Sequence, residues 1–190
     1  MTFDLEPLKQ RLIPVTSVAD SDCAQGAEAA VAIILNPALK DGSTLLIRRT
    51  ERAGDPWSGQ VAFPGGHRSA TDRTQVETAI REVSEEVGID LSQNELLGGL
   101  PFMYSRGRRV LVAPLVFKLV HEASIRLNQE VATSFWIPLD ALSTMRVARR
   151  EVEDEGLKLI VDSYVYDNHV IWGLTFRIIN ALLNRNGSTV

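Results

Sequence analysis

Runs of aliphatic residues separated by polar, turn-forming segments predict a chain built from strands and helices. Residues 29–35 are an uninterrupted apolar run and residues 44–49 contain the apolar stretch Leu-Leu-Ile, and the Asp-Gly pair between them, at 41–42, favours a hairpin of two buried strands. Further strands are expected at residues 96–100, 110–119, 135–139, 158–166 and 169–172. Pro114 lies inside the run 110–119 and suggests an edge strand or a bulge, and a long apolar edge there would allow a homodimer.

Helical spacing of apolar residues predicts two helices near the ends of the chain. Residues 3–12 carry Phe and Leu at this spacing, and residues 173–183 repeat Leu and Ile in the same way. Residues 14–26 are expected to be irregular, and residues 146–155 are charged and expected to be exposed.

A third helix is predicted between Asp72 or Thr74, either of which can cap its N-terminus, and Gly88, which can end it in a left-handed conformation. Its apolar residues recur at three- and four-residue spacing and form one stripe to bury: Val76, Ala79, Ile80, Val83 and Val87. The sequence therefore fixes both ends of this helix and its buried face.

Three glutamates lie on the predicted helix, on the side away from the apolar stripe. Glu82, Glu85 and Glu86 stand at i, i+3 and i+4, so their carboxylates repel one another unless a cation lies among them. Glutamates on a helix most often form a solvated face. Here a Gly pair, Gly65 and Gly66, lies upstream, where backbone can approach a ligand closely, and a hard divalent cation is the natural partner.

Composition places the chain among ordinary soluble proteins and narrows its partners. The 190 residues are 45% hydrophobic and 23% charged, which suits one domain, 1–190, with a core at about 29–183, and no membrane span. Twenty basic and 24 acidic residues give a net charge of −4, which argues against nucleic acid as a partner. Cys23 is the single cysteine, and the N-terminus lacks an apolar signal core, so a reducing cytoplasm is expected.

The glutamate helix carries the motif of a known family. Residues 81–89, REVSEEVGI, match the second half of the Nudix signature, REUXEEXGU, at every specified position, and the chain resembles the Nudix hydrolases. The first half departs from the signature. Fourteen residues separate Gly66 from Arg81 where the signature has thirteen, and the early glutamate position falls near Asp72 and Arg73.

The resemblance implies an α/β fold of the Nudix type, an α/β/α sandwich with a central mixed sheet. It also implies a metal-dependent hydrolase that cleaves the pyrophosphate of a nucleoside diphosphate linked to another moiety. Mg²⁺ or Mn²⁺ would be held by Glu82, Glu85 and Glu86, with the Gly66 carbonyl as a further ligand. Arg81 is expected to orient a glutamate by an ion pair rather than to touch substrate.

Upstream residues resemble the coenzyme A pyrophosphatase branch of this family. The matching positions are Leu45, Leu46, Arg49, Gly59 and residues 63–66. Ile47, Thr50 and Gly54 depart from the branch pattern, and the segment up to Gly59 is one residue longer. Coenzyme A is thus one candidate substrate beside ADP-ribose, a dinucleotide or an oxidised nucleotide.

Candidate substrate and catalytic residues flank the motif. Three arginines, Arg48, Arg49 and Arg52, precede the Gly pair and are plausible phosphate contacts as a group, and Gln60 joins Arg49 and Arg52 as a candidate substrate residue. Glu130 lies on a loop that in several Nudix enzymes supplies a metal ligand or catalytic base. Glu85, Glu86, Arg81 and Glu130 are therefore the predicted catalytic residues.

A different functional class stays open on the sequence. A Nudix-fold module that binds a nucleotide without turning it over would usually lack one of the motif glutamates, and this chain keeps all three, which favours the enzyme. No Ser/His/Asp or Cys/His constellation supports a nucleophilic enzyme.

Overall fold

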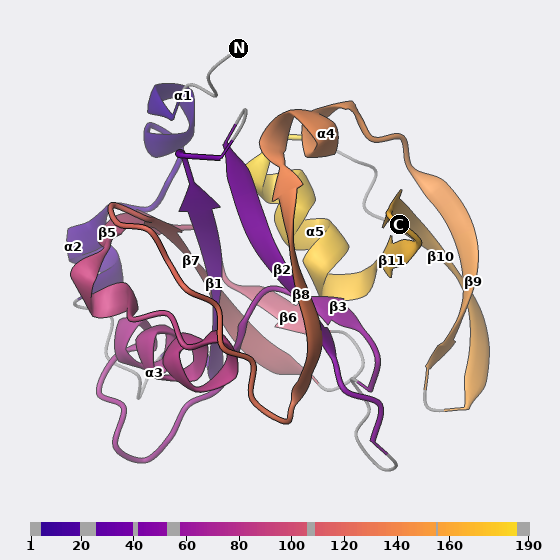
Figure 1. The fold of residues 1–190 in the computed structure, drawn as a ribbon, viewed down its shortest axis with the longest axis horizontal. Helices are drawn as coiled ribbons and strands as arrows, with labels where there is room; N and C mark the ends of the chain where they lie inside the picture. Colours follow the sequence, from indigo (N-terminus) through magenta and orange to yellow (C-terminus); the bar gives the residue numbers. More distant parts are fainter. Residues whose placement is uncertain are drawn as a thin grey trace.

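The computed structural model describes residues 5–19, 26–39, 42–52, 58–105, 109–154 and 156–185. Its main sheet has eight strands (Figure 1): β1 (Ala29–Asn36), β2 (Ser43–Arg49), β3 (Val61–Ala62), β4 (Gly65–His67), β5 (Glu95–Gly99), β6 (Met103–Ser105), β7 (Val110–Lys118) and β8 (Val131–Pro138). A separate three-stranded sheet contains β9 (Ala148–Asp154), β10 (Leu157–Tyr166) and β11 (His169–Ile171). The helices are α1 (Glu6–Lys9), α2 (Val15–Ala19), α3 (Gln75–Val87), α4 (Leu139–Thr144) and α5 (Gly173–Leu182), with a 3₁₀ turn, η1 (Leu91–Gln93).

The main sheet is mixed, as predicted. β1 and β2 form the expected antiparallel hairpin, with Leu35 opposite Thr44. On its other side β1 runs parallel to β7 through seven residue pairs, from Ala29 with Val112 to Leu35 with Lys118. On the side of β2, the first residues of β1 pair with the short strand β4. The Gly-Gly segment is therefore held directly against the central strand.

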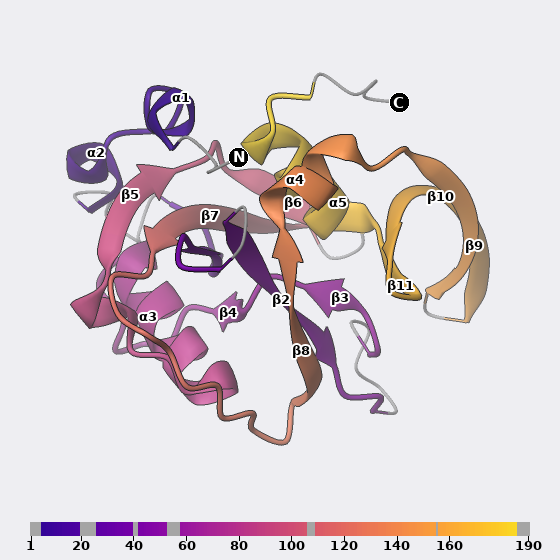
Figure 2. The ribbon, with the colours of Figure 1, turned by 45° about the horizontal axis from the view of Figure 1, so that its top comes forward.

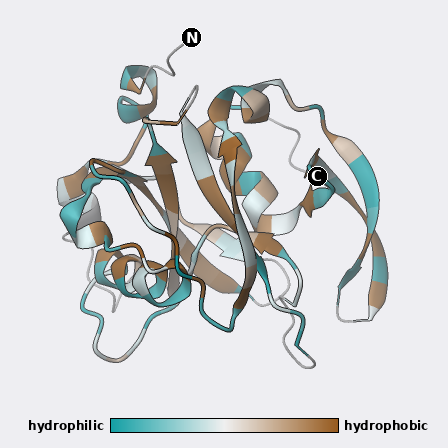
Figure 3. Cartoon of the chain, viewed as in Figure 1, coloured by the Kyte–Doolittle hydropathy of each residue, from teal (hydrophilic) through white to brown (hydrophobic). Residues whose placement is uncertain are grey.

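Helices cover both faces of this sheet (Figure 2). Alternate residues of β1 point to opposite sides, because successive side chains of a strand do so. Ile34 packs in the core that contains Val83 and Val87 of α3, whereas Ile33 packs in the core that contains Ile178 of α5. The predicted α/β/α sandwich is confirmed in this arrangement, and the hydrophobic colour in Figure 3 concentrates on the central strands.

Of the two alternatives for Pro114, the edge strand was wrong, whereas the ladder beside it is irregular, with residues 100–102 opposite residues 113–114. β7 is not an edge strand, because β1 lies along one side and β5 and β6 lie along the other. Pro114 fits because it faces the gap between β5 and β6, where its carbonyl accepts a hydrogen bond from the Leu100 amide at 2.9 Å and no ladder partner calls for a donor. The apolar run is therefore covered, and it offers no edge for a homodimer.

Several terminal and charged segments also differ from the expectations. The first helix is one turn, Glu6–Lys9, and a second short helix, Val15–Ala19, lies in the segment expected to be irregular. Residues 148–154 are mostly exposed, as expected, but they form strand β9, since pairing with β10 satisfies their backbone. The hairpin through Asp167 and Asn168 and the C-terminal helix α5 are confirmed.

Candidate active site

Helix α3 carries the motif glutamates and begins and ends where its sequence predicts. The Thr74 hydroxyl accepts a hydrogen bond from the Glu77 amide at 3.1 Å, and Gly88 ends the helix with φ of 71°. Ala79, Val83 and Val87 are fully buried against the sheet. These contacts fix the rotation of α3 and so the direction in which its glutamates point.

The Gly-Gly segment of β4 lies against two of these glutamates. The Gly65 amide donates a hydrogen bond to Glu86 Oε2 at 2.9 Å. A Cβ atom on Gly65 would lie 2.2 Å from the Ala30 carbonyl oxygen, and a Cβ atom on Gly66 would lie 2.5 Å from Glu82 Oε2. Glycine at position 65 lets this strand lie against the backbone of β1, and glycine at position 66 leaves room for the Glu82 carboxylate.

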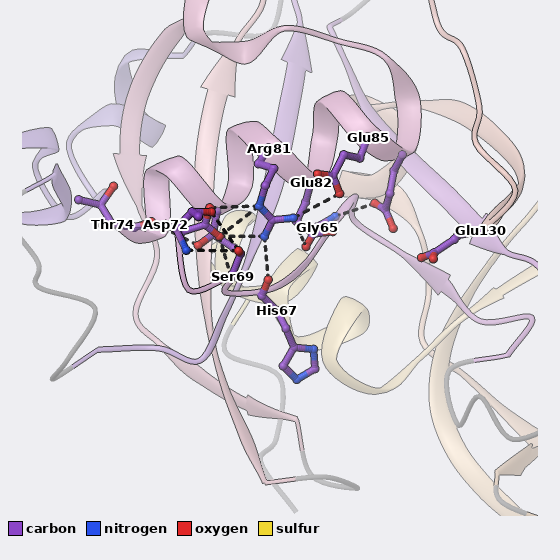
Figure 4. Close-up of polar contacts among 12 residues, drawn as sticks. Gly65, His67, Ser69, Asp72, Thr74, Arg81, Glu82, Glu85 and Glu130 are labelled. Carbon is purple, nitrogen blue, oxygen red and sulfur yellow. Dashed lines mark hydrogen bonds and ion pairs between the residues drawn. The ribbon is translucent and has the colours of Figure 1, made fainter.

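Arg81 joins three carboxylates through one guanidinium group (Figure 4). Its Nη2 donates to Asp72 Oδ2 at 2.8 Å, while its Nη1 donates to Glu82 Oε1 at 2.8 Å and to Glu85 Oε2 at 3.3 Å. A further bond from Nη2 reaches the His67 carbonyl at 2.9 Å. These hydrogen bonds from Arg81 hold the pKa of the Asp72 carboxyl below its usual range, and burial raises the pKa of Glu82.

Asp72 is the functional candidate that the motif analysis did not select. It stands near the position of the early signature glutamate, and the structure brings it to Arg81, with additional bonds from Nε of 3.1 and 3.2 Å to its two oxygens. The sequence contained a signal for Asp72: it stands near the position of the early signature glutamate, and the segment between Gly66 and Arg81 has one extra residue. The shorter Asp side chain reaches the guanidinium because the loop before α3 turns through a bond from the Ser69 amide to Asp72 Oδ2.

Glu86 does not share the exposed side of α3, which corrects the prediction. Only 2% of its surface is exposed, because β4 covers it. Desolvation by this burial raises the pKa of Glu86 to about 7, against the hydrogen bond from Gly65 and the charge of Arg49, which lower it. Arg49 Nη1 lies 3.4 Å from Glu86 Oε1.

Glu130 approaches the same place from the turn before β8. The negative charge of Glu130 adds to the upward shift of the pKa of both Glu82 and Glu86, so the three carboxylates lie within electrostatic reach. Its oxygens lie 3.8 Å from Arg49 Nη2 and 3.8 Å from Arg52 Nη1. The structure thus brings two of the candidate arginines and the loop glutamate together with the motif.

The remaining substrate candidates lie in different surroundings. Arg48 pairs with Glu51 on the surface. Gln60 Nε2 lies 3.5 Å from Asp154 Oδ1, at the end of β9, so its amide is directed to the second sheet. Gly54, one of the departures from the coenzyme A pattern, lies outside the described residues.

The fit of a metal ion can be judged from the donors present. Among the described residues, no three His, Cys, Asp or Glu side chains converge into a preassembled cage. Mg²⁺ keeps several waters and takes one or two carboxylates, so it needs no such cage. Glu86 is 2% exposed, and the Glu82 carboxylate lies close to Gly66 in the same place. Two carboxylates removed from water in this way favour a cation that offsets their charge. The donor set fits a hard divalent cation.

The family model described as the NUDIX domain matches residues 26–158. Two curated relatives are uncharacterized Nudix hydrolases NudL. The protein of Photorhabdus laumondii is 39% identical over 153 residues, which are 80% of this chain and 81% of the relative. The protein of Yersinia pestis strain Pestoides F is 39% identical over 142 residues, which are 73% of this chain and 70% of the relative.

Solved structures share the fold at lower identity. A Caenorhabditis elegans Ap4A hydrolase in a binary complex superposes with a TM-score of 0.51 and 21% identity, covering 60% of this chain and 81% of that one. A MutT/nudix family protein of Enterococcus faecalis gives 0.50 and 16%, covering 95% of this chain and 73% of that one. No described helix has the length and apolar character needed to cross a membrane. The motif on α3, the matched domain and the relatives together show that this chain belongs to the Nudix family, as a pyrophosphohydrolase.

Proposed function

We propose that this enzyme hydrolyses the pyrophosphate bond of a nucleoside diphosphate linked to another moiety, at the carboxylates of α3. The observation that carries the proposal is the position of Glu86, buried between the Gly65 amide and Arg49 with Glu82 and Glu130 close by. A buried carboxylate with like charges around it is stabilised when a cation and a phosphate group complete the site.

In this proposal Glu82, Glu85 and Glu86 hold Mg²⁺ or Mn²⁺, and the Gly66 carbonyl adds a ligand. When bound there, the cation supplies neutralisation of phosphoryl charge and a lower pKa for the attacking water. Arg81 orients Glu82 and Glu85, because its Nη1 donates to both of them.

The other residues bind substrate and move a proton. Arg49 and Arg52 contact phosphate oxygens, since both guanidinium groups lie beside the carboxylate cluster. Glu130, whose side chain is 50% exposed, accepts the proton of the attacking water. Gln60 contacts the part of the substrate that lies toward β9.

Coenzyme A is the substrate that we propose first. Leu45, Leu46 and Arg49 stand together on β2, which pairs along its length with β8, the strand that follows Glu130. Of these residues Arg49 supports the link to the site, because its Nη2 lies 3.8 Å from Glu130 Oε2. Leu45 and Leu46 are buried in the cores on opposite faces of the sheet.

The test is product release from a panel of compounds by the full chain with Mg²⁺ or Mn²⁺: coenzyme A, ADP-ribose, NADH, diadenosine polyphosphates and nucleoside triphosphates. Preference for coenzyme A, giving 3′,5′-ADP and phosphopantetheine, supports this substrate. Preference for another member overturns coenzyme A but keeps the site. Glu82→Gln is expected to lower the rate with any substrate by about 100-fold. Glu122→Gln, an exposed glutamate, is the matched control, and unchanged turnover by Glu82→Gln would overturn the site.

A further inference from the structure

The outer strand of the second sheet has a free edge. The order of that sheet is β11-β10-β9, and within the described residues no strand pairs with the outer side of β9. Figure 1 shows this strand at the rim of the molecule, away from α3. An unpaired edge exposes backbone donors and acceptors that readily pair with another strand.

The neighbouring strand β10 exposes large apolar side chains near this edge. Leu157 is 65% exposed, Ile160 is 62% exposed and Leu159 is 39% exposed. Leu159 stands directly opposite Val152 of β9, so their side chains share one face of the sheet. Leu157 lies on the same face as Leu159, whereas Ile160 lies on the opposite face, beside Glu151. A second sheet joined at β9 would extend the apolar row of the first face.

The charges of β9 change sign along the strand. Residues 149–154 read RREVED, so the face that carries Val152 has Arg150 before it and Asp154 after it, while the other face carries Arg149, Glu151 and Glu153. Arg150 and Asp154 lie two positions before and two after Val152, so all three side chains point to the same face. Charged side chains on an edge strand can simply prevent aggregation, but this role does not require a basic residue on one side of Val152 and an acidic residue on the other. When a second copy of β9 pairs antiparallel with the first at Val152, the basic residue of each strand stands opposite the acidic residue of the other.

We propose that two copies of this chain associate through β9, antiparallel, about a two-fold axis at Val152. In this register Arg150 of each copy faces Asp154 of the other, and the two Val152 side chains face each other. Asp154 already has its Oδ1 3.5 Å from Gln60 Nε2 within its own chain, so Arg150 is a second partner for that carboxylate. The row Leu159–Val152 then continues into the same row of the second copy, across four strands. The two three-stranded sheets join into one.

The opposite face of the joined sheet is compatible with this register. Glu151 there faces Glu153 of the second copy, and like charges at this position repel. Lys158 offsets the repulsion, because its Nζ lies 2.8 Å from Glu151 Oε1 and its backbone pairs with Glu153. The interface therefore rests on two ion pairs and the apolar row.

The experiment is sedimentation of the full chain and of two charge-reversed variants. The wild type is expected at twice the chain mass of 21.0 kDa. Arg150→Asp and Asp154→Arg each place like charges opposite one another, and each is expected to raise the dissociation constant of the dimer at least about tenfold. An equal mixture of the two variants restores both ion pairs and is expected to sediment as a dimer again. Arg146→Asp, the same charge change at an exposed residue before β9, is the matched control and is expected to leave the dimer intact.

The mixture separates the interface from a folding defect, because misfolded variants would not recover by mixing. A monomeric wild type, a dimer that survives Arg150→Asp, or a mixture that stays monomeric would each overturn the proposal. The register has its own test in the Cys23→Ser background. Val152→Cys is expected to form a disulfide between copies on oxidation, whereas Glu151→Cys is not, because the two copies of residue 151 are diagonal neighbours, about 7–8 Å apart.

Discussion

Asp72 and Glu86 are both buried carboxylates at the candidate active site, with exposed fractions of 8% and 2%, but their charges meet opposite surroundings. Asp72 receives three hydrogen bonds from Arg81, and its pKa is lowered. Glu86 has Arg49 only at 3.4 Å and lies in reach of the charges of Glu82 and Glu130, and its pKa is raised to about 7. The charge of Asp72 is therefore paired within the protein. The charge of Glu86 has no full partner among the described residues, which agrees with the proposed divalent cation.

The comparison separates a structural charge from a functional one. Breaking the Asp72 pair should cost stability as well as activity. Neutralising Glu86 should cost activity alone, because a buried carboxylate without a full partner is itself unfavourable.

Glu86→Gln should give the largest change in rate. The amide keeps the shape and can still accept the Gly65 hydrogen bond, but it removes the charge proposed to hold the cation. We expect kcat/KM to fall by at least about 100-fold. The free energy of unfolding of the metal-free protein should be unchanged or slightly higher, measured by urea denaturation with a chelator present. A stability loss as large as the activity loss would contradict the contrast with Asp72.

Asp72→Asn should show the opposite balance. Arg81 would keep Glu82 and Glu85 but lose its strongest partner, so we expect a loss of about 2 kcal/mol in unfolding free energy. Activity should fall by about 10-fold to 100-fold, since Arg81 would no longer be held in place. Arg73→Ala, at the next residue of the loop before α3, removes an arginine whose side chain is 87% exposed, and it should change stability by less than about 0.5 kcal/mol. Equal effects of the two variants would deny the structural role of Asp72.

Gly66→Ala tests the contact between β4 and Glu82. The added methyl group would meet a carboxylate at the end of a flexible side chain, so the fold should survive with a loss within about 1 kcal/mol. Displacement of Glu82 should lower kcat/KM by about 10-fold. Gly65→Ala is the informative contrast, because its methyl group would meet backbone at φ of 149° and should cost about 2 kcal/mol or more. Activity of Gly66→Ala equal to wild type would remove Glu82 from the site.

The smallest expected effect is the pH dependence of the Asp72 pair. Its pKa in the folded protein lies below the ordinary value of 3.8, so the folded state favours the charged form. The stabilisation is therefore complete above 3.8 and is lost as pH falls through the folded pKa. The difference in unfolding free energy between wild type and Asp72→Asn should be constant well above pH 3.8 and should shrink as the pH falls below 3.8. If this difference in unfolding free energy grew as the pH fell, the pKa of Asp72 would be raised and not lowered in the folded protein.

Local sequence was enough to predict the elements whose geometry is set by nearby residues. Thr74 and Gly88 bound α3 because capping and left-handed φ act within a few residues. The apolar runs at β1 and β2 predicted a hairpin, and the Asp167-Asn168 turn predicted the β10–β11 pair. The motif glutamates and the Gly pair could be selected in the same way.

Pairings between distant residues could not be predicted. Strand β9 looks like a charged, exposed segment until β10 supplies its ladder. Pro114 suggested an edge because its lack of an amide hydrogen is a local fact, whereas the gap between β5 and β6 that accommodates it is a tertiary one. Asp72 gave no motif match, because its role depends on reaching Arg81 nine residues later across the turn into α3.

The sequence by itself determined the family, the helix that carries the glutamates and the likeness to a metal-dependent pyrophosphohydrolase, because these depend on residue types at fixed spacing. The tertiary structure alone decided which glutamate is buried, which arginines approach it and which sheet edge stays open. Burial and desolvation depend on what packs over a residue, and for Glu86 that cover is strand β4, some twenty residues earlier in the chain.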